Sequence, residues 1–168
     1  GGQSSKSSQA GSIAKFTAGG NTGAKKDLAQ IAMAYGHVYV AQIAMGANPA
    51  QTIKAMKEAE SYDGPSLIIA YSPCIEHGIK TGMQHSQSNG YLATKCGYFL
   101  TFRYNPDTKK FSLDSKEPEF DKYEDYLMTE NRFASLVRKD KERARLLLEE
   151  QKQWAIDRYN YYKKISEE

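Results

Sequence analysis

The chain holds two cysteines, Cys74 and Cys96, and these are its best candidates for metal-binding chemistry. Cys74 follows a proline in Ser-Pro-Cys-Ile-Glu-His-Gly, just after an apolar run that ends at Tyr71, whereas Cys96 lies near the end of a predicted helix. Free cysteines are usually small buried hydrophobic residues, and an iron–sulfur cluster normally needs four thiolates. From position alone, Cys74 is therefore either a packing residue or one ligand of a group completed from outside the chain.

The histidines do not form a recognisable site with these cysteines. His37, His77 and His85 are scattered, and no two of them have the i, i+4 spacing of a metal-binding helix. The sequence also lacks a nucleophile elbow, a P-loop and a dinucleotide-binding fingerprint. We therefore expect the histidines to be hydrogen-bonding residues, and the residues by themselves do not define a reaction.

A βαβ unit is predicted to position Cys74. Continuous apolar runs at residues 37–45 and 66–71 have the character of buried strands, and they flank a helix that runs from the Asn48-Pro49 cap to about Glu60. The predicted apolar face of this helix consists of Ile53, Met56 and Ala59. Two such strands around a helix indicate a right-handed crossover in a parallel sheet, and Cys74 then lies at the sheet edge where ligands bind.

The rest of the chain is predicted to extend this unit. Asp27 can cap a short helix that ends at Gly36, another helix covers residues 83–95, and an aromatic strand covers residues 98–104. Residues 109–118 are polar and suited to an extended arm.

Two helices are predicted at the carboxyl-terminal end of the chain. Thr129 can cap the first, and a long helix follows over residues 140–164. The predicted packing face of the long helix consists of Ala144, Leu147, Leu148, Gln151, Trp154, Ala155, Arg158 and Tyr162.

Residues 1–26 are rich in glycine, serine and alanine and are predicted to lack regular structure. Composition leaves two interpretations open for this segment, a flexible linker or a glycine-rich loop that becomes ordered around a phosphate. The chain opens Gly-Gly-Gln without an initiator methionine, from which we expect a piece of a longer sequence.

Composition excludes several classes of partner. The net charge is +3 and charges of both signs alternate, which predicts neither nucleic-acid binding nor a basic membrane patch. No apolar run approaches the roughly 20 residues of a membrane helix. With only two cysteines, a disulfide scaffold is excluded, and a reducing, cytoplasmic location is expected.

The sequence resembles the thiamine-diphosphate-binding region and carboxyl-terminal extension of pyruvate:ferredoxin (flavodoxin) oxidoreductases. The resemblance covers essentially the whole chain. It is carried by residues 1–6 (Gly-Gly-Gln-Ser-Ser-Lys), 31–40, 59–78 (through Ser-Pro-Cys-Ile-Glu-His-Gly), 103–106 (Arg-Tyr-Asn-Pro) and 113–118. It implies an α/β fold, part of a parallel-sheet thiamine-diphosphate domain over residues 1–106, with a mainly helical extension over 107–168.

The resemblance also implies an activity. Such enzymes decarboxylate pyruvate oxidatively to acetyl-CoA and pass electrons to ferredoxin or flavodoxin. The implied cofactors are thiamine diphosphate, Mg²⁺ and a [4Fe-4S] cluster, all completed by residues outside this chain. The implied partners are the rest of the enzyme, coenzyme A, and a second subunit in a homodimer. The alternative is a non-catalytic assembly or binding module that keeps the fold.

Site residues follow from the same resemblance. Gly1 and Gly2 match the glycines of a Thr-Gly-Gly-Gln stretch that closes the thiamine and magnesium motif, where backbone approaches the diphosphate. Cys74 matches the last ligand of the cluster nearest the thiamine. Cys96 matches no ligand and is expected to be a packing residue.

Overall fold

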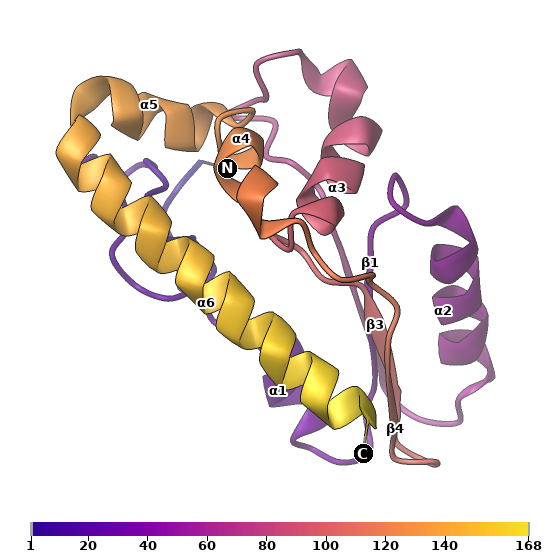
Figure 1. The fold of residues 1–168 in the computed structure, drawn as a ribbon. Coiled ribbons are helices and arrows are strands. Elements are labelled where there is room, and N and C mark those ends of the chain that lie inside the picture. The colour runs from indigo at the N-terminus through magenta and orange to yellow at the C-terminus, as the bar shows by residue number, and fades with distance from the viewer. Residues whose placement is uncertain (1, 168) are drawn as a thin grey trace.

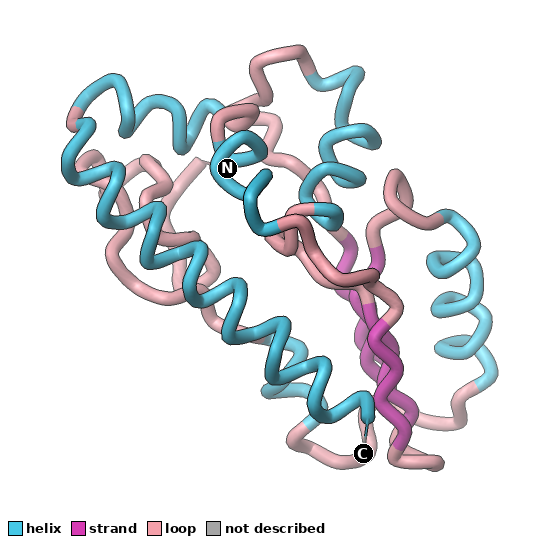
Figure 2. The backbone as a smooth tube through the Cα atoms, in the orientation of Figure 1, coloured by secondary structure: helices cyan, strands magenta, loops and turns pink. Residues whose placement is uncertain are grey.

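A four-stranded mixed sheet forms the centre of the molecule in the computed structural model, which describes residues 2–167 (Figure 1). The strand order is β2-β1-β3-β4. Helix α2 covers one face of the sheet, and α1 and the long helix α6 cover the other (Figure 2). No helix among the described residues is long and apolar enough to cross a membrane.

The predicted βαβ unit is confirmed. Strands β1 (Tyr39–Ile43) and β2 (Ser66–Ala70) are parallel, and α2 (Pro49–Ser61) connects them. Asn48 caps α2 by accepting a hydrogen bond from the Gln51 amide at 2.9 Å, with Pro49 in the first turn. Proline fits there because the first helical amides have no intrahelical acceptor.

The predicted apolar face of α2 is wrong in part. Ile53 and Met56 are 56 % and 49 % exposed, whereas Ala55 is fully buried against Tyr39 and Ala41 of β1. The small Ala55 side chain lets the helix approach the sheet closely. The larger side chains, although correctly spaced for a helix, therefore lie on its outer side.

The third strand runs opposite to the first two. Strand β3 (Phe102–Asn105) is shorter than the predicted 98–104 and pairs antiparallel with β1. Residues 109–118 are not simply an arm across another surface, because Lys110–Leu113 form β4, which pairs antiparallel with β3. The predicted parallel sheet is thus parallel only between β1 and β2, and a hairpin completes it.

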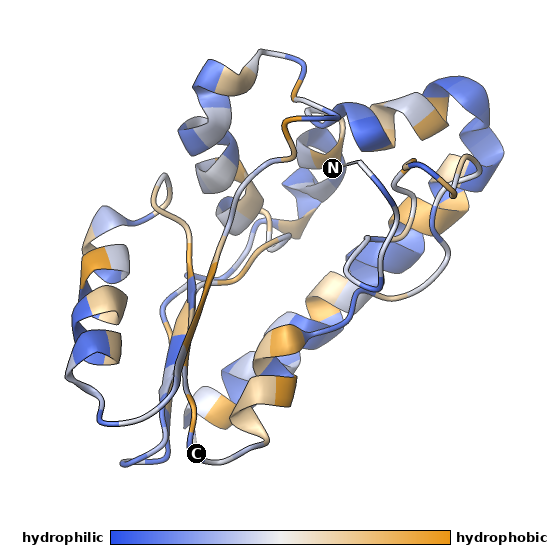
Figure 3. Cartoon of the chain, turned by 180° about the vertical axis from the view of Figure 1, so that it is seen from behind, coloured by the Kyte–Doolittle hydropathy of each residue, from blue (hydrophilic) through white to orange (hydrophobic). Residues whose placement is uncertain are grey.

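Aromatic packing joins α6 (Lys141–Glu167) to the sheet. Tyr162 of α6 is fully buried against Phe102 of β3 and Phe111 of β4. Its hydroxyl donates to Asp27 at 2.8 Å, and Asp27 also caps α1 (Leu28–Met33) as predicted. Figure 3 shows apolar and polar residues alternating along α6. The predicted long helix and its periodicity are confirmed, although Trp154 and Arg158 are only half-buried.

The remaining helices gather beyond the sheet edge. They are the 3₁₀ turn η1 (Met83–His85), α3 (Ser86–Lys95), the 3₁₀ turn η2 (Phe120–Lys122), α4 (Tyr123–Leu127) and α5 (Asn131–Lys139). The predicted cap at Thr129 is wrong, because Glu130 occupies the cap position of α5. The Thr129 hydroxyl instead bonds the Asn89 side chain at 2.9 Å and the Tyr126 carbonyl at 2.7 Å.

Residues 2–26 form no helix or strand, as predicted, but they pack on the carboxyl-terminal helices. The Ile13 amide donates to the Arg132 carbonyl at 2.9 Å, and Arg143 of α6 donates to the Gly19 carbonyl at 2.6 Å. Ala10 is fully buried. The linker interpretation is therefore wrong for this part of the segment, because its backbone is bonded to distant elements.

A charged cluster joins α2 to the β-hairpin. Arg103 of β3 makes two hydrogen bonds to Asp114, at 2.9 and 2.8 Å, and a third to Glu58 of α2 at 2.6 Å. The Arg103 side chain is 12 % exposed. A bidentate arginine–carboxylate pair of this kind is stronger than an exposed ion pair.

We predict that Arg103→Leu lowers the free energy of unfolding by about 1–3 kcal/mol, because it removes the cationic partner of two partly buried carboxylates. Urea denaturation followed by circular dichroism measures this loss. The matched control is Arg145→Leu, which removes an exposed pair with Glu142 and should cost less than about 0.5 kcal/mol. Equal losses in the two variants would contradict the assignment.

Candidate functional site

Gly2 and Cys74, two predicted site residues that are far apart in the sequence, line the same cavity. It has a volume of about 180 Å³ and lies beside the loop that follows β2, at the carboxyl end of the parallel strands. Its other lining residues are Gln3, Ser5, Ser7, Ser8, Ser12, Ile13, Ala14, His77 and Arg132. The predicted position of Cys74 at this sheet edge is confirmed, and the serine-rich segment forms the opposite wall.

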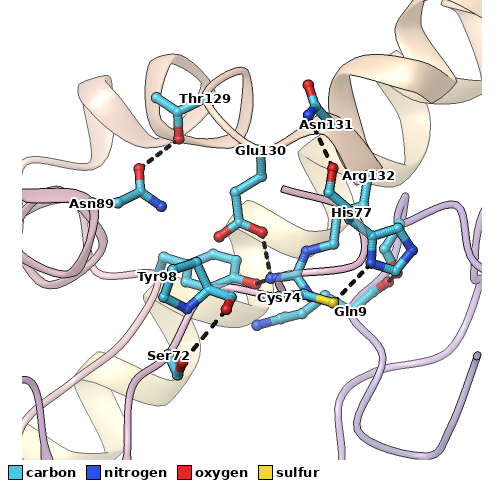
Figure 4. Close-up of polar contacts among 12 residues, drawn as sticks. Gln9, Ser72, Cys74, His77, Asn89, Tyr98, Thr129, Glu130, Asn131 and Arg132 are labelled. Atoms are coloured by element: carbon cyan, nitrogen blue, oxygen red, sulfur yellow. Dashed lines mark hydrogen bonds and ion pairs between the residues drawn. The ribbon is translucent and has the colours of Figure 1, made fainter. Parts of the chain in front are cut away.

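Hydrogen bonds hold the Cys74 loop in a tight turn. The Gly78 amide donates to the Cys74 carbonyl at 2.8 Å, and Asn131 of α5 donates to the His77 carbonyl at 2.9 Å. His77 Nδ1 lies 3.2 Å from the Cys74 sulfur (Figure 4). Cys74 itself is half-buried. The turn therefore fixes the thiol at the cavity wall while leaving it accessible.

The backbone conformation at position 2 and the neighbouring Glu76 side chain favour a glycine there. The φ of Gly2 is +75°, and a Cβ there would lie 2.5 Å from Cγ of Glu76, so no other residue fits without displacement. Glu76 pairs with Lys15 at 3.6 Å. The close approach of Glu76 thus explains why this position is glycine, without reference to a bound ligand. A role of Gly2 in binding a diphosphate stays a prediction. Gly1 lies outside the described residues.

A buried carboxylate connects the strand end to the carboxyl-terminal helices. Glu130, 2 % exposed, accepts hydrogen bonds from Tyr126 at 2.6 Å and Tyr71 at 3.1 Å. Burial raises the pKa of Tyr71, and the Glu130 carboxylate raises it further. Burial likewise raises the pKa of Tyr126. Both tyrosines therefore stay protonated and act as donors.

Arg132 completes this network and also reaches the cavity. Its Nη2 pairs with the Glu130 carboxylate and donates to the Tyr98 hydroxyl at 3.0 Å (Figure 4). Burial acts to lower the pKa of the guanidinium, but Tyr98 and Glu130 favour its charged form and raise the pKa above the usual arginine range. Sequence reasoning missed this pair, because the spacing Glu-x-Arg at a helix start is ordinary on exposed surfaces.

The other chemically active side chains do not converge on the cavity. His37 Nδ1 lies 2.9 Å from the Tyr35 carbonyl oxygen, and His85 lies in η1. Cys96 is 1 % exposed, and burial raises the pKa of its thiol to about 12. Among residues 2–167, no group of three or more His, Cys, Asp or Glu side chains is placed to hold a metal ion. Any metal at Cys74 would need ligands from elsewhere.

Comparison with known proteins found close relatives but no matching family model. The chain is 48 % identical over 99 % of its length to "Pyruvate:ferredoxin oxidoreductase" of Moorella thermoacetica. It is 45 % identical over its full length to "Pyruvate-flavodoxin oxidoreductase" of Klebsiella pneumoniae, and 44 % identical over 99 % to "Pyruvate dehydrogenase [NADP(+)]" of Cryptosporidium parvum. It spans 14 %, 15 % and 9 % of these relatives. The resemblance drawn from the motifs is thereby confirmed, and the match is to a segment of those proteins.

We predict that Cys74 is alkylated by iodoacetamide much faster than Cys96 in the folded chain. At about pH 8 a thiol reacts as its thiolate, and the Cys96 thiol is buried with a raised pKa. Mass spectrometry of timed samples measures both rates. In concentrated urea the two cysteines should react alike. Similar rates in the folded chain would contradict the burial of Cys96.

Proposed function

We propose that this chain is a segment of a pyruvate oxidoreductase that passes electrons to ferredoxin or flavodoxin. The observation that carries the proposal is 45–48 % identity to such enzymes over essentially the whole chain. The convergence of Gly2 and Cys74 on one cavity supports it, since both match cofactor-binding positions of the family.

The donor chemistry at Cys74 fits a shared cluster. A thiolate is a soft ligand suited to iron, and Cys74 lies on a cavity wall with its loop fixed by Gly78 and Asn131. The described part of the chain offers one thiol there. We therefore propose that Cys74 supplies one ligand of a [4Fe-4S] cluster and that the remaining ligands come from another part of the enzyme.

The thiamine site is proposed to use backbone rather than side chains of this chain. Gly1 and Gly2 would supply amides beside the diphosphate, while Mg²⁺ and its ligands come from outside the chain. Bound thiamine diphosphate would supply the stabilisation of negative charge that decarboxylation requires. Residues of this chain would then orient the cofactor and exclude water from one side.

The wider assignments rest on the same proposal. Residues 1–106 would form the carboxyl-terminal part of a thiamine-diphosphate-binding domain, and residues 107–168 its extension. Coenzyme A, pyruvate and a second subunit would be bound by the complete enzyme. A non-catalytic module with the same fold is the competing interpretation, and the iron content of a Cys74 variant distinguishes the two.

We predict that Cys74→Ala, made in the longer protein that contains this segment, removes or destabilises one cluster, because three thiolates hold it less tightly than four. Iron content and low-temperature electron paramagnetic resonance spectra measure the loss.

Cys96→Ala is the matched control and should have the iron content of the unaltered protein, since Cys96 is buried away from the cavity. An unchanged iron content and spectrum in Cys74→Ala would refute the ligand assignment.

We also predict that the isolated chain binds thiamine diphosphate weakly and catalyses no pyruvate oxidation. A diphosphate held by two glycine amides alone lacks the metal ion, which is the largest neutralising charge of such a site. A loss of about 4 kcal/mol weakens binding roughly a thousandfold. Calorimetric titration with thiamine diphosphate and Mg²⁺ measures the affinity. Saturable micromolar binding, or pyruvate-dependent dye reduction, would show that the site is misplaced.

A further inference from the structure

Arg132 is enclosed by protein on one side and borders the Cys74 cavity on the other. Its Nε is buried and has no hydrogen-bond partner among the described residues, although Nη2 is bonded to Glu130 and Tyr98. Arg132 lines the same cavity as Cys74 and His77. The enclosed Nε does not open into the cavity, so the contribution of Arg132 there is its positive charge.

The Arg132 guanidinium is held from several sides. Glu130 and Tyr98 fix its outer edge, and the Phe133 ring lies 5.1 Å from its central carbon. Its backbone carbonyl accepts the Ile13 amide from the cavity wall. A side chain held in this way presents a fixed positive charge that does not need to reorganise when an anionic group binds.

The Glu130 carboxylate partly offsets the positive charge of Arg132 at the cavity. Glu130 is not among the residues lining the cavity, whereas Arg132 is, so the positive end of the pair is nearer to Cys74. The cavity therefore experiences the positive end of a fixed dipole. Positive charge and donated hydrogen bonds beside an iron–sulfur group favour its reduced form, which carries more negative charge.

On the premise of the proposed function, we infer that Arg132 is a positioning residue for the redox group held at Cys74. Its positive charge, partly offset by Glu130, raises the reduction potential of that group. The carboxyl-terminal extension thus contributes to electron transfer through α5, although it supplies no ligand.

Two variants of the longer protein test this inference by the sign of their effects. Glu130→Gln keeps the guanidinium and removes its counter-charge, so the midpoint potential should become more positive. The double variant Glu130→Gln/Arg132→Met removes both charges without leaving a buried carboxylate unpaired, so the potential should become more negative. A redox titration followed by electron paramagnetic resonance measures both shifts, with iron content determined in parallel.

Arg132→Lys and Arg138→Met are the comparisons. The lysine keeps the positive charge, so its potential should lie closer to that of the unaltered protein than to that of the double variant. Arg138, exposed on the same helix and bonded to Ser135, should have no effect when replaced. A purely structural role would lower iron content or stability without moving the potential in opposite directions.

Different measurements test the role of Arg132 and the ligand role of Cys74. Unchanged potentials in Glu130→Gln and the double variant, with iron retained, would overturn the role of Arg132 while leaving the ligand role of Cys74 intact. Shifts of the same sign in both variants would also overturn it. An unchanged iron content in Cys74→Ala would instead overturn the proposed function itself.

Discussion

The buried Glu130 carboxylate is the constraint on which the arrangement around the cavity depends. A carboxylate in this position is tolerated only with several donors, and here Tyr71, Tyr126 and Arg132 supply them. These donors come from the end of β2, from α4 and from α5. Satisfying one charge therefore fixes the Cys74 loop relative to the carboxyl-terminal helices, because Cys74 follows Tyr71 by only three residues.

The amino-terminal segment and α6 depend on this arrangement in turn. Residues 2–26 have few apolar side chains with which to pack, and their backbone is bonded instead to Arg132 and to α6. Helix α6 spans about 40 Å at 1.5 Å per residue and reaches the sheet through Tyr162. The extension is thus an integral part of the fold. It completes both the cavity and the second face of the sheet.

The two polar clusters, one on the α2 face of the sheet and one beyond the carboxyl end of the parallel strands, have different surroundings. Arg103, with Asp114 and Glu58, joins α2 to the hairpin, and each of its three guanidinium nitrogens donates to a carboxylate of the chain. Arg132 pairs with Glu130 and also lines the cavity that contains Cys74. The first cluster stabilises the fold, whereas the second also places a positive charge beside a cavity.

The sequence by itself determined the local elements and the place of Cys74. Apolar runs, the Asn48-Pro49 cap and the periodicity of residues 140–164 are local patterns, and hydrogen bonds within four residues enforce them. Only the tertiary structure decided the direction of β3, the pairing of β4 and the burial of Glu130 with Arg132. It also decided which side of α2 faces the solvent. Strand direction and burial depend on partners distant in the chain. A charged pair has the same amino-acid sequence whether it is exposed to solvent or buried.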